Sequence, residues 1–273
     1  MRNLKSHGII IVALMTMAGC TTKNKSGLCL EHSSIDKYYN IDIDDSQKSP
    51  MFEKDGYSLH NSAQIVWPAS IDGEVPTELQ KSILQTAFGD SVNTSLNDAL
   101  ECFAKSAYGL EEDDIKNITD TDSANANKGE FMQSVAVEMS EVSAKRYVFS
   151  IFIQTNVADA AHGMYSMWYI TYDRINKNIV TLDLLFKNKE KLRELLENQR
   201  RNDLKEQGMS YDDYMIEEFP ISESFRIHGS QIEFIYQPYD IASYAEGIQT
   251  VTLSYYDMNH AGILTAYAKN IME

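Results

Sequence analysis

Cys20 is the residue whose surroundings point most specifically to a chemical reaction. An apolar run over residues 8–19 leads up to it, and Arg2 and Lys5 precede that run. A basic start, an apolar stretch of about ten residues and small residues before the cleavage point are typical of an export signal, which is too short to span a bilayer. Residues 17–20 resemble a bacterial lipobox. We therefore expect cleavage before Cys20 and acylation of its thiol.

Acylation of Cys20 predicts where the chain resides. Residues 1–19 are then a lipoprotein signal peptide, and the polar residues 20–33 are a tether between the lipid and the folded part. Two or three acyl chains anchor a protein far more firmly than one. The predicted location is the cell envelope, and the outer membrane where the source has one, because Thr21 does not resemble an inner-membrane retention signal. The alternative is an uncleaved anchor over residues 8–19, which leaves the same body outside the cytoplasm.

The two remaining cysteines, Cys29 and Cys102, are candidates for a disulfide. Exported proteins fold in an oxidising compartment, where such bonds persist. The alternative is a buried free thiol at Cys102 and an unpaired Cys29. No cysteine lies at a spacing from histidine that is typical of a zinc site, so we expect no metal and no cofactor.

Motifs for catalysis are few. The chain lacks the His-Glu-x-x-His, Gly-x-Ser-x-Gly, phosphate-loop and dinucleotide-binding patterns. Ser34 and Lys37 match a Ser-x-x-Lys spacing, but no companion motif accompanies them. His162 is the histidine that best fits a site, and it either donates to a ligand or fixes the loop in which it lies. We therefore expect no catalytic residues and no enzymatic activity.

The charge of the chain limits its partners. With 24 Lys and Arg against 40 Asp and Glu, the formal net charge is −16 at pH 7. Such a field repels nucleic acids and anionic lipid headgroups, and it raises the rate of encounter with a cationic partner. The simpler alternative is that the acidity only keeps an exported protein soluble. We expect no nucleic-acid partner, and the charge favours a basic protein.

The spacing of apolar residues predicts interspersed strands and helices. Leu79, Ile83 and Ala87 recur at helical spacing after Pro76, and residues 147–153 alternate as in a strand. Predicted strands cover residues 62–67, 132–142, 146–157, 164–173, 224–228, 231–236 and 248–255; predicted helices cover 76–88, 95–110, 187–207, 210–218, 239–246 and 257–271. Since no regular strand–helix–strand rhythm occurs, the predicted class is α+β, with a mainly antiparallel sheet and helices packed on it.

Two folded regions are expected. Residues 111–130 are the most acidic and least apolar stretch, and we predict a solvated loop there. The Asp and Asn residues in this stretch do not match a calcium-binding loop, because Ala124, Asn125 and Phe131 stand where such a loop needs other residues. The predicted organisation is a small N-terminal α+β region over residues 34–130 and a second α+β domain over residues 131–273.

Residues 168–186 and 234–255 resemble a known family. They look like the extracytoplasmic C-terminal domain of RsiV, a lysozyme-sensing anti-sigma factor, and this domain also accompanies the deacetylase PdaC. The resemblance covers roughly residues 160–270, and residues 62–88 are more loosely similar to the small domain that often precedes it. Its most specific part is residues 238–247, which predict a short helix begun by the proline and ended by the glycine.

The resemblance implies a binding domain, because the domain in RsiV docks lysozyme, a very basic protein. Neither the sigma-binding segment of RsiV nor the metal motif of the PdaC deacetylase is found, so neither output is expected. The residues expected to bind are Pro238, Tyr239, Tyr244, Gly247 and His162. We expect a membrane-anchored binding module for lysozyme or another cell-wall-active protein. A peptidoglycan- or glycan-binding module is the first alternative, and a cell-wall-modifying enzyme is the second.

Overall fold

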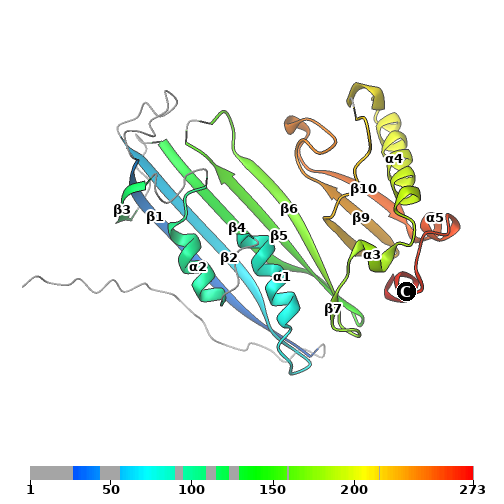
Figure 1. Cartoon of the computed structure of the whole chain (residues 1–273), viewed down its shortest axis with the longest axis horizontal. Helices are drawn as coiled ribbons and strands as arrows, with labels where there is room; N and C mark the ends of the chain where they lie inside the picture. The colour runs from blue at the N-terminus through cyan, green and yellow to red at the C-terminus, as the bar shows by residue number, and fades with distance from the viewer. Residues whose placement is uncertain are drawn as a thin grey trace, which may run out of the picture.

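The computed structural model describes residues 27–43, 56–89, 95–108, 115–122, 129–158, 160–214 and 216–272. It contains a large sheet with two helices on one face and, beside the last strands of that sheet, a smaller sheet with helices of its own (Figure 1). The predicted α+β class, with a mainly antiparallel sheet and helices packed on it, is confirmed.

The predicted N-terminal anchor lies outside the residues that the structure describes. Cys20, the signal peptide over residues 1–19 and the first part of the tether are not among the described residues, so acylation of Cys20 stays a prediction. Within the described ranges, no helix is long and apolar enough to cross a membrane. The tether ends earlier than predicted, because strand β1 (Leu28–Ile43) already begins at a buried leucine that pairs with Ile71.

Seven strands form the large sheet, in the order β3-β1-β2-β4-β5-β6-β7. After β1 they are β2 (Tyr57–Ile71), β3 (Ile115–Thr121), β4 (Gly129–Val142), β5 (Arg146–Asn156), β6 (Met164–Asp173) and β7 (Asn178–Ile179). Neighbours are antiparallel except β2 and β4, which run parallel. A parallel pair needs a long crossover, and here the crossover contains two helices and β3.

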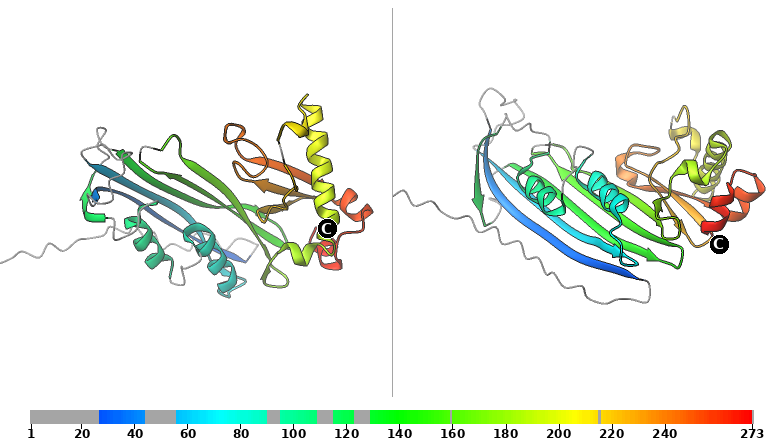
Figure 2. Two further views of the ribbon diagram at one scale, coloured as in Figure 1. Left: turned by 45° about the horizontal axis from the view of Figure 1, so that its top comes forward. Right: turned by 60° about the horizontal axis from the view of Figure 1, so that its bottom comes forward.

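The two helices, α1 (Thr77–Phe88) and α2 (Leu96–Lys105), lie over the same face of the large sheet (Figure 2). Pro76 precedes α1, as predicted, and the Ser95 side chain accepts from the amide of Asp98 at the start of α2. Their apolar stripes are buried against alternate residues of β2, β4 and β5. The opposite face of these strands therefore carries the other set of alternating side chains.

Asn61 is a buried amide that fixes the end of α2 to β2. Its Nδ2 lies 2.9 Å from the carbonyl oxygen of Phe103, 3.1 Å from that of Ala104 and 2.7 Å from that of Ser106. The last carbonyl groups of a helix accept no hydrogen bond from an amide of the same helix. The side chain of Asn61 therefore donates to all three carbonyls, together with Ser106 at Phe103 and Gln133 at Ser106.

We expect Asn61→Ala to lower the free energy of unfolding by about 1–3 kcal/mol, because it removes the side-chain donor of the Ala104 carbonyl and one of the donors to the Phe103 and Ser106 carbonyls. Urea unfolding followed by circular dichroism measures this change. Asn202→Ala, at an exposed position of the chain, is the matched control and should change the free energy by less than about 0.5 kcal/mol. Equal losses for the two variants would contradict this role of Asn61.

The smaller sheet contains three antiparallel strands in the order β10-β9-β8. They are β8 (Phe225–His228), β9 (Gln231–Tyr236) and β10 (Gln249–Ser254). Four α-helices and two 3₁₀ turns belong to this unit: α3 (Leu182–Leu185), α4 (Lys189–Glu206), α5 (Tyr255–His260), α6 (Ala266–Met272), η3 (Tyr211–Tyr214) and η4 (Tyr244–Glu246). Their buried side chains form one core, with Phe234 fully buried between Phe186 and Phe225.

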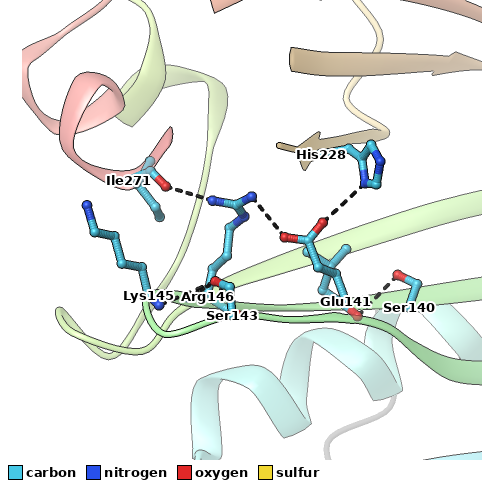
Figure 3. Close-up of polar contacts among 8 residues, drawn as sticks. Ser140, Glu141, Ser143, Lys145, Arg146, His228 and Ile271 are labelled. Atoms are coloured by element: carbon cyan, nitrogen blue, oxygen red, sulfur yellow. Dashed lines mark hydrogen bonds and ion pairs between the residues drawn. The ribbon is translucent and has the colours of Figure 1, made fainter. Parts of the chain in front are cut away.

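A buried arginine joins the two parts of the fold (Figure 3). Arg146, at the start of β5, is only 6% exposed, and its guanidinium lies 2.8 Å from a carboxylate oxygen of Glu141 in β4. Its other terminal nitrogen donates to the carbonyl of Ile271 in α6, at 2.9 Å. The second carboxylate oxygen of Glu141 lies 3.3 Å from Nδ1 of His228 in β8. This network fixes the smaller unit beside the end of the large sheet.

The division of the chain differs from the prediction. The predicted boundary between residues 130 and 131 falls inside β4, and strands from both sides of it share one sheet. The buried clusters separate near residue 180 instead, because the core of the smaller unit begins at Val180. The predicted loop over residues 111–130 contains β3, which pairs with β1 despite its polar sequence. Pro68 does not end β2, which continues to Ile71 across a bulge opposite Leu30.

Three predicted helices differ in the structure. The expected helix over residues 257–271 is two helices, α5 and α6, because Gly262 has a positive φ of 69° and Leu264 forms a bridge with Phe186. The expected helix over residues 239–246 is reduced to the 3₁₀ turn η4, because Tyr239 has a positive φ of 77° that no α-helix accommodates. The described residues of 210–218 likewise form the 3₁₀ turn η3 in place of the predicted helix.

The predicted disulfide between Cys29 and Cys102 is wrong, because Cys102 is a free thiol. It is also exposed, so the alternative of a buried thiol fails as well. Asn61 contacts Phe103, next to Cys102, and Asn61 pairs with Lys37 in β1. Cys29 lies eight residues earlier in the same strand, which is about 26 Å at 3.3 Å per residue. That separation exceeds what a disulfide spans.

Candidate functional site

Three of the predicted binding residues meet in one aromatic cluster, formed by His162, Tyr239 and Tyr244. The rings of His162 and Tyr244 stack, with centroids 3.8 Å apart and planes 21° apart. The hydroxyl of Tyr239 lies 3.2 Å from Nε2 of His162. Because Nδ1 of His162 lies 2.9 Å from the carbonyl of Gly163, which can only accept, Nδ1 carries the proton and Nε2 accepts from Tyr239.

The cluster is built from two segments far apart in sequence. His162 stands in the loop before β6, and the two tyrosines stand between β9 and β10. The hydroxyl of Tyr244 donates to the carbonyl of Gly163 at 2.7 Å, which ties the segments together. Gln237 ties them a second time, because its side-chain amide both donates to and accepts from the backbone of Met167, each at 2.8 Å.

Gly247 and Pro238 are the other two predicted binding residues, and they differ from the aromatic cluster in that they do not present exposed side chains. A Cβ at Gly247 would lie 3.0 Å from the hydroxyl of Tyr165, which leaves little room for a side chain. The residue also has a φ of +71°, which favours glycine for a second reason. Pro238 is buried and begins the turn that presents Tyr239. Both residues therefore shape the cluster rather than offer contacts.

The turn after Pro238 directs Tyr239 outward. Asp240 closes the turn, since its carboxylate accepts from the amide of Gln237 at 2.7 Å and its own amide donates to the Gln237 carbonyl at 3.0 Å. The side chain of Tyr239 is 58% exposed. A tyrosine with positive φ carries a backbone cost, and such costs are concentrated at functional positions. The geometry thus holds an aromatic ring in the solvent at a defined place.

A groove of about 910 Å³ begins at Tyr239. One wall is the segment of residues 209–220, which follows α4, and the other wall is the segment of residues 239–246. Its lining combines apolar and acidic side chains: Met209, Tyr214, Ile216, Glu217, Glu218, Pro220, Tyr239, Asp240, Ile241, Ala242, Ser243 and Glu246. Tyr239 belongs to both the groove and the aromatic cluster, so the two form one continuous surface.

Four carboxylates line this groove, and three of them have fixed positions, Asp240 through its bond from the amide of Gln237. Oε2 of Glu246 accepts from the hydroxyl of Tyr214 at 2.7 Å, and its Oε1 accepts from the hydroxyl of Ser243 at 3.0 Å. Glu218 forms an ion pair with Arg193 of α4. Glu217 and Asp240 add two further negative charges. The groove as a whole is acidic.

A buried arginine lies behind one wall of the groove. Arg200 of α4 is 3% exposed, and its guanidinium lies 5.5 Å from the ring centre of Tyr214. Its Nε and one Nη have no hydrogen-bond partner among the described residues. The hydrogen bond from Tyr214, with smaller contributions from Ser243 and the charge of Arg200, lowers the pKa of Glu246. These contacts therefore favour the charged form of Glu246.

We expect Tyr214→Phe to raise the pKa of Glu246 toward its ordinary value, because the variant lacks the hydroxyl that stabilises the carboxylate. The stabilisation from this hydrogen bond is present above the ordinary glutamate pKa of about 4.3, and it is lost as the pH falls through the lower pKa of the folded state. Carboxyl ¹³C NMR titration measures the shift. Tyr239→Phe is the control, and a Glu246 pKa that is the same in both variants would contradict this assignment.

This surface offers contacts that suit cationic side chains. An exposed tyrosine ring and carboxylates at the edge of a groove attract cationic side chains through cation–π and ionic contacts. Among the described residues, no group of three or more His, Cys, Asp or Glu side chains could hold a metal ion. The predicted absence of catalytic residues stays a prediction.

Sequence reasoning missed the acidic wall. Tyr214 and Glu217 come from a segment that the sequence assigned to a small helix, and they reach the groove only because η3 follows the long helix α4. Glu246 lies within the segment singled out by the resemblance, so it could have been included. The ring of Tyr165 meets that of Tyr244 edge-on, with centroids 5.7 Å apart. From the sequence, Tyr165 was only one residue of the strand predicted over residues 164–173.

Comparisons with known proteins agree with this architecture. Residues 177–256 match the model of a family described as protein of unknown function (DUF3298). A DUF3298 family member from Bacteroides fragilis has a similar structure, with a TM-score of 0.64 and 18% identity over 91% of this chain and 99% of that one. A DUF3298 family protein from Pseudomonas aeruginosa gives a TM-score of 0.57 and 12% identity over 88% of this chain and 96% of that one. No curated protein matches.

The matched region covers most of the smaller unit, which continues beyond it through α5 and α6. Residues 177–256 begin just before the core of the smaller unit and include both walls of the groove. At these identities the two solved structures show a common fold and nothing about ligands. The chain thus contains a DUF3298 domain, over residues 177–256, within a fold that two solved members of that family share.

Proposed function

We propose that this protein is a membrane-anchored, extracytoplasmic lipoprotein that binds a basic protein partner, such as lysozyme or another cell-wall-active protein. The observation that carries the proposal is the groove of about 910 Å³, with four carboxylates on its lining and Tyr239 exposed at its edge. The net charge of −16 supports the same partner class, because it steers cationic proteins toward this surface.

The size of the groove defines what enters it. Ligand sites usually measure about 300–1,000 Å³, so this groove accepts a few side chains of a partner rather than a whole domain. Lys and Arg side chains suit it, since they can place their charge among Glu217, Asp240 and Glu246 while their aliphatic parts contact Ile216 and Tyr239. A basic protein surface would contribute such side chains from an exposed loop or helix.

The anchor gives this proposal its cellular setting. Acylation at Cys20 would hold the chain at a membrane surface outside the cytoplasm, where cell-wall-active proteins act. The residues before β1 would then separate the fold from the lipid. Mass spectrometry of the protein extracted from its native membrane tests this part, because a Cys20→Ser chain should lack the acyl mass and appear in the soluble fraction. Membrane retention of Cys20→Ser would contradict it.

Calorimetric titration of the purified chain with lysozyme, at low and at physiological salt, tests the binding proposal. We expect saturable binding at both, with weaker affinity at higher salt because opposite charges meet in the complex. Lysozyme with acetylated lysines is the matched control, since acetylation removes the charge and leaves most of the shape. Binding that does not weaken with salt, or equal binding of the acetylated protein, would contradict the ionic basis of the proposal. Absence of heat at either salt would contradict lysozyme as the partner.

A further inference from the structure

A row of polar side chains crosses the face of the large sheet that α1 and α2 leave open. Asp36 of β1 pairs with Ser62 of β2, Ser62 with Ser134 of β4, Ser134 with Gln154 of β5, and Gln154 with Tyr165 of β6. Directly paired residues place their side chains on the same face of a sheet. We call these five residues the polar track.

The polar track lies on the face opposite the helices. The residues next to it in sequence, Ala63, Val135 and Ile153, belong to the core under α1 and α2, so the track residues must point the other way. Figure 2 shows both helices over one face of the sheet. Asp36 and Gln154 are exposed, and the other three track residues are partly exposed. With strands about 4.8 Å apart, the track spans about 19 Å across the sheet.

Aromatic rings stand at both ends of the polar track. At the β1 end, the ring of His60 stacks on Tyr38, with centroids 4.0 Å apart, and its Nε2 lies 2.8 Å from Asp36. At the β6 end, the ring centroid of Tyr165 lies 6.2 Å from that of Phe152 and 5.7 Å from that of Tyr244. A hollow of about 420 Å³ runs beside the middle of the track, lined in part by Ser34, Gln64 and Ala136.

The chemistry of the polar track limits its ligand. The carboxylate of Asp36 stands at one end of the track and is held by His60, whereas the hydroxyl and amide side chains of the other members offer donors and acceptors without charge. The rings at each end offer flat apolar faces. A nucleic acid or an anionic polysaccharide is disfavoured by the net charge of −16. An extended peptide adds to a sheet along its edge, whereas the track crosses the strands on the face. A sugar chain fits, because each ring combines apolar faces with a rim of hydroxyl and amide groups.

We propose that the polar track binds a neutral, extended glycan chain, laid across the strands, with its terminal rings against the aromatic side chains. The part of this site on β1, β2 and β4 is formed by other elements than the groove at Tyr214 and Glu217, and its β6 end adjoins the aromatic cluster through the contact of Tyr165 with Tyr244. It goes beyond partner-protein binding: the chain would hold a partner and a glycan at once. The middle of the ligand would receive hydrogen bonds from Ser134 and Gln154.

The test uses the hexamer of β-1,4-linked N-acetylglucosamine as the probe, titrated into the purified chain and followed by calorimetry. We expect saturable binding whose affinity is the same at low and high salt. Gln154→Ala should weaken it about threefold and Tyr165→Ala about tenfold. Gln231→Ala, at an exposed glutamine of the smaller sheet, is the control and should bind like the unchanged chain. Circular dichroism melting of each variant verifies that the fold is retained.

Three outcomes would overturn the proposal: no saturable binding of the hexamer, binding that falls steeply with salt, or equal affinities for Gln154→Ala and Gln231→Ala. Should Tyr165→Ala fail to fold, Ser134→Trp replaces it, because a bulky ring in the middle of the track should abolish binding. Lysozyme is left out of this titration, so its result is independent of the groove. Failure here leaves the partner proposal standing, and failure of lysozyme binding leaves this one standing.

Discussion

Arg146→Met is expected to lower the free energy of unfolding by about 3 kcal/mol. The guanidinium is buried, and it supplies the ion pair to Glu141 and the donor to the carbonyl of Ile271 (Figure 3). Methionine fills a similar volume but leaves the carbonyl without this donor and the carboxylate with His228 alone. Removing one member of a buried ion pair typically costs about 3–5 kcal/mol, and the partial exposure of Glu141 places this variant at the lower end of that range.

Two further variants isolate the ion pair. Arg201→Met removes an exposed arginine that bonds Glu197 four residues earlier, and it should cost less than about 1 kcal/mol. The double variant Arg146→Met with Glu141→Leu should recover part of the loss, because it leaves no buried charge unpaired. Urea unfolding measures all three. If Arg146→Met were no more harmful than Arg201→Met, the network would not join the two parts of the fold.

The double variant Glu217→Gln with Asp240→Asn is expected to weaken lysozyme binding about tenfold at physiological salt. Both changes keep the shape of the side chain, and an asparagine at residue 240 can still accept from the amide of Gln237, so the turn is preserved. Each lost ionic contact at an interface rim is worth about 0.5–1 kcal/mol, and about 1.4 kcal/mol corresponds to a tenfold change in affinity. The salt dependence should become shallower as well.

The control for this double variant changes the net charge by the same amount at positions away from the groove. Glu78→Gln with Glu101→Gln removes two exposed carboxylates from α1 and α2. General attraction between an acidic protein and a basic one would weaken equally in both double variants. A groove-specific contact would weaken only in the first. Equal loss of affinity in the two would therefore contradict the groove as the binding site.

Local signals in the sequence predicted many elements well. Pro76 and Ser95 mark the starts of α1 and α2, and both helices bury the apolar stripes expected of them. The predicted strands over residues 132–142 and 146–157 correspond to β4 and β5, and those over residues 224–228 and 231–236 correspond to β8 and β9. These features depend on residues close in sequence, which is why the sequence was sufficient.

Features that depend on distant pairing were not predictable in the same way. The polar strand β3 exists because β1 offers a free edge to residues 115–121, and nothing in that short segment indicates a strand. The parallel pairing of β2 with β4 places residues on both sides of the expected domain boundary in one sheet. The break between α5 and α6 depends on a bridge to Phe186, far away in the chain.

The candidate site was also predicted only in part. His162, Tyr239 and Tyr244 were named together because of the resemblance, and the structure brings them into contact. The acids of the groove were not named, since they stand among forty acidic residues and no spacing distinguishes them. Glu217 becomes a candidate only once the segment after α4 is seen to face Tyr239 across the groove.

Hydrogen–deuterium exchange of the chain, with and without saturating lysozyme, tests the central claim most directly, because it locates the contact on the backbone. We predict slower exchange in residues 209–220 and 238–246, the two walls of the groove, and unchanged exchange in β1, β2 and β4. Slower exchange confined to the large sheet, or no change in the two walls when lysozyme is bound, would contradict the groove as the site where a basic partner binds.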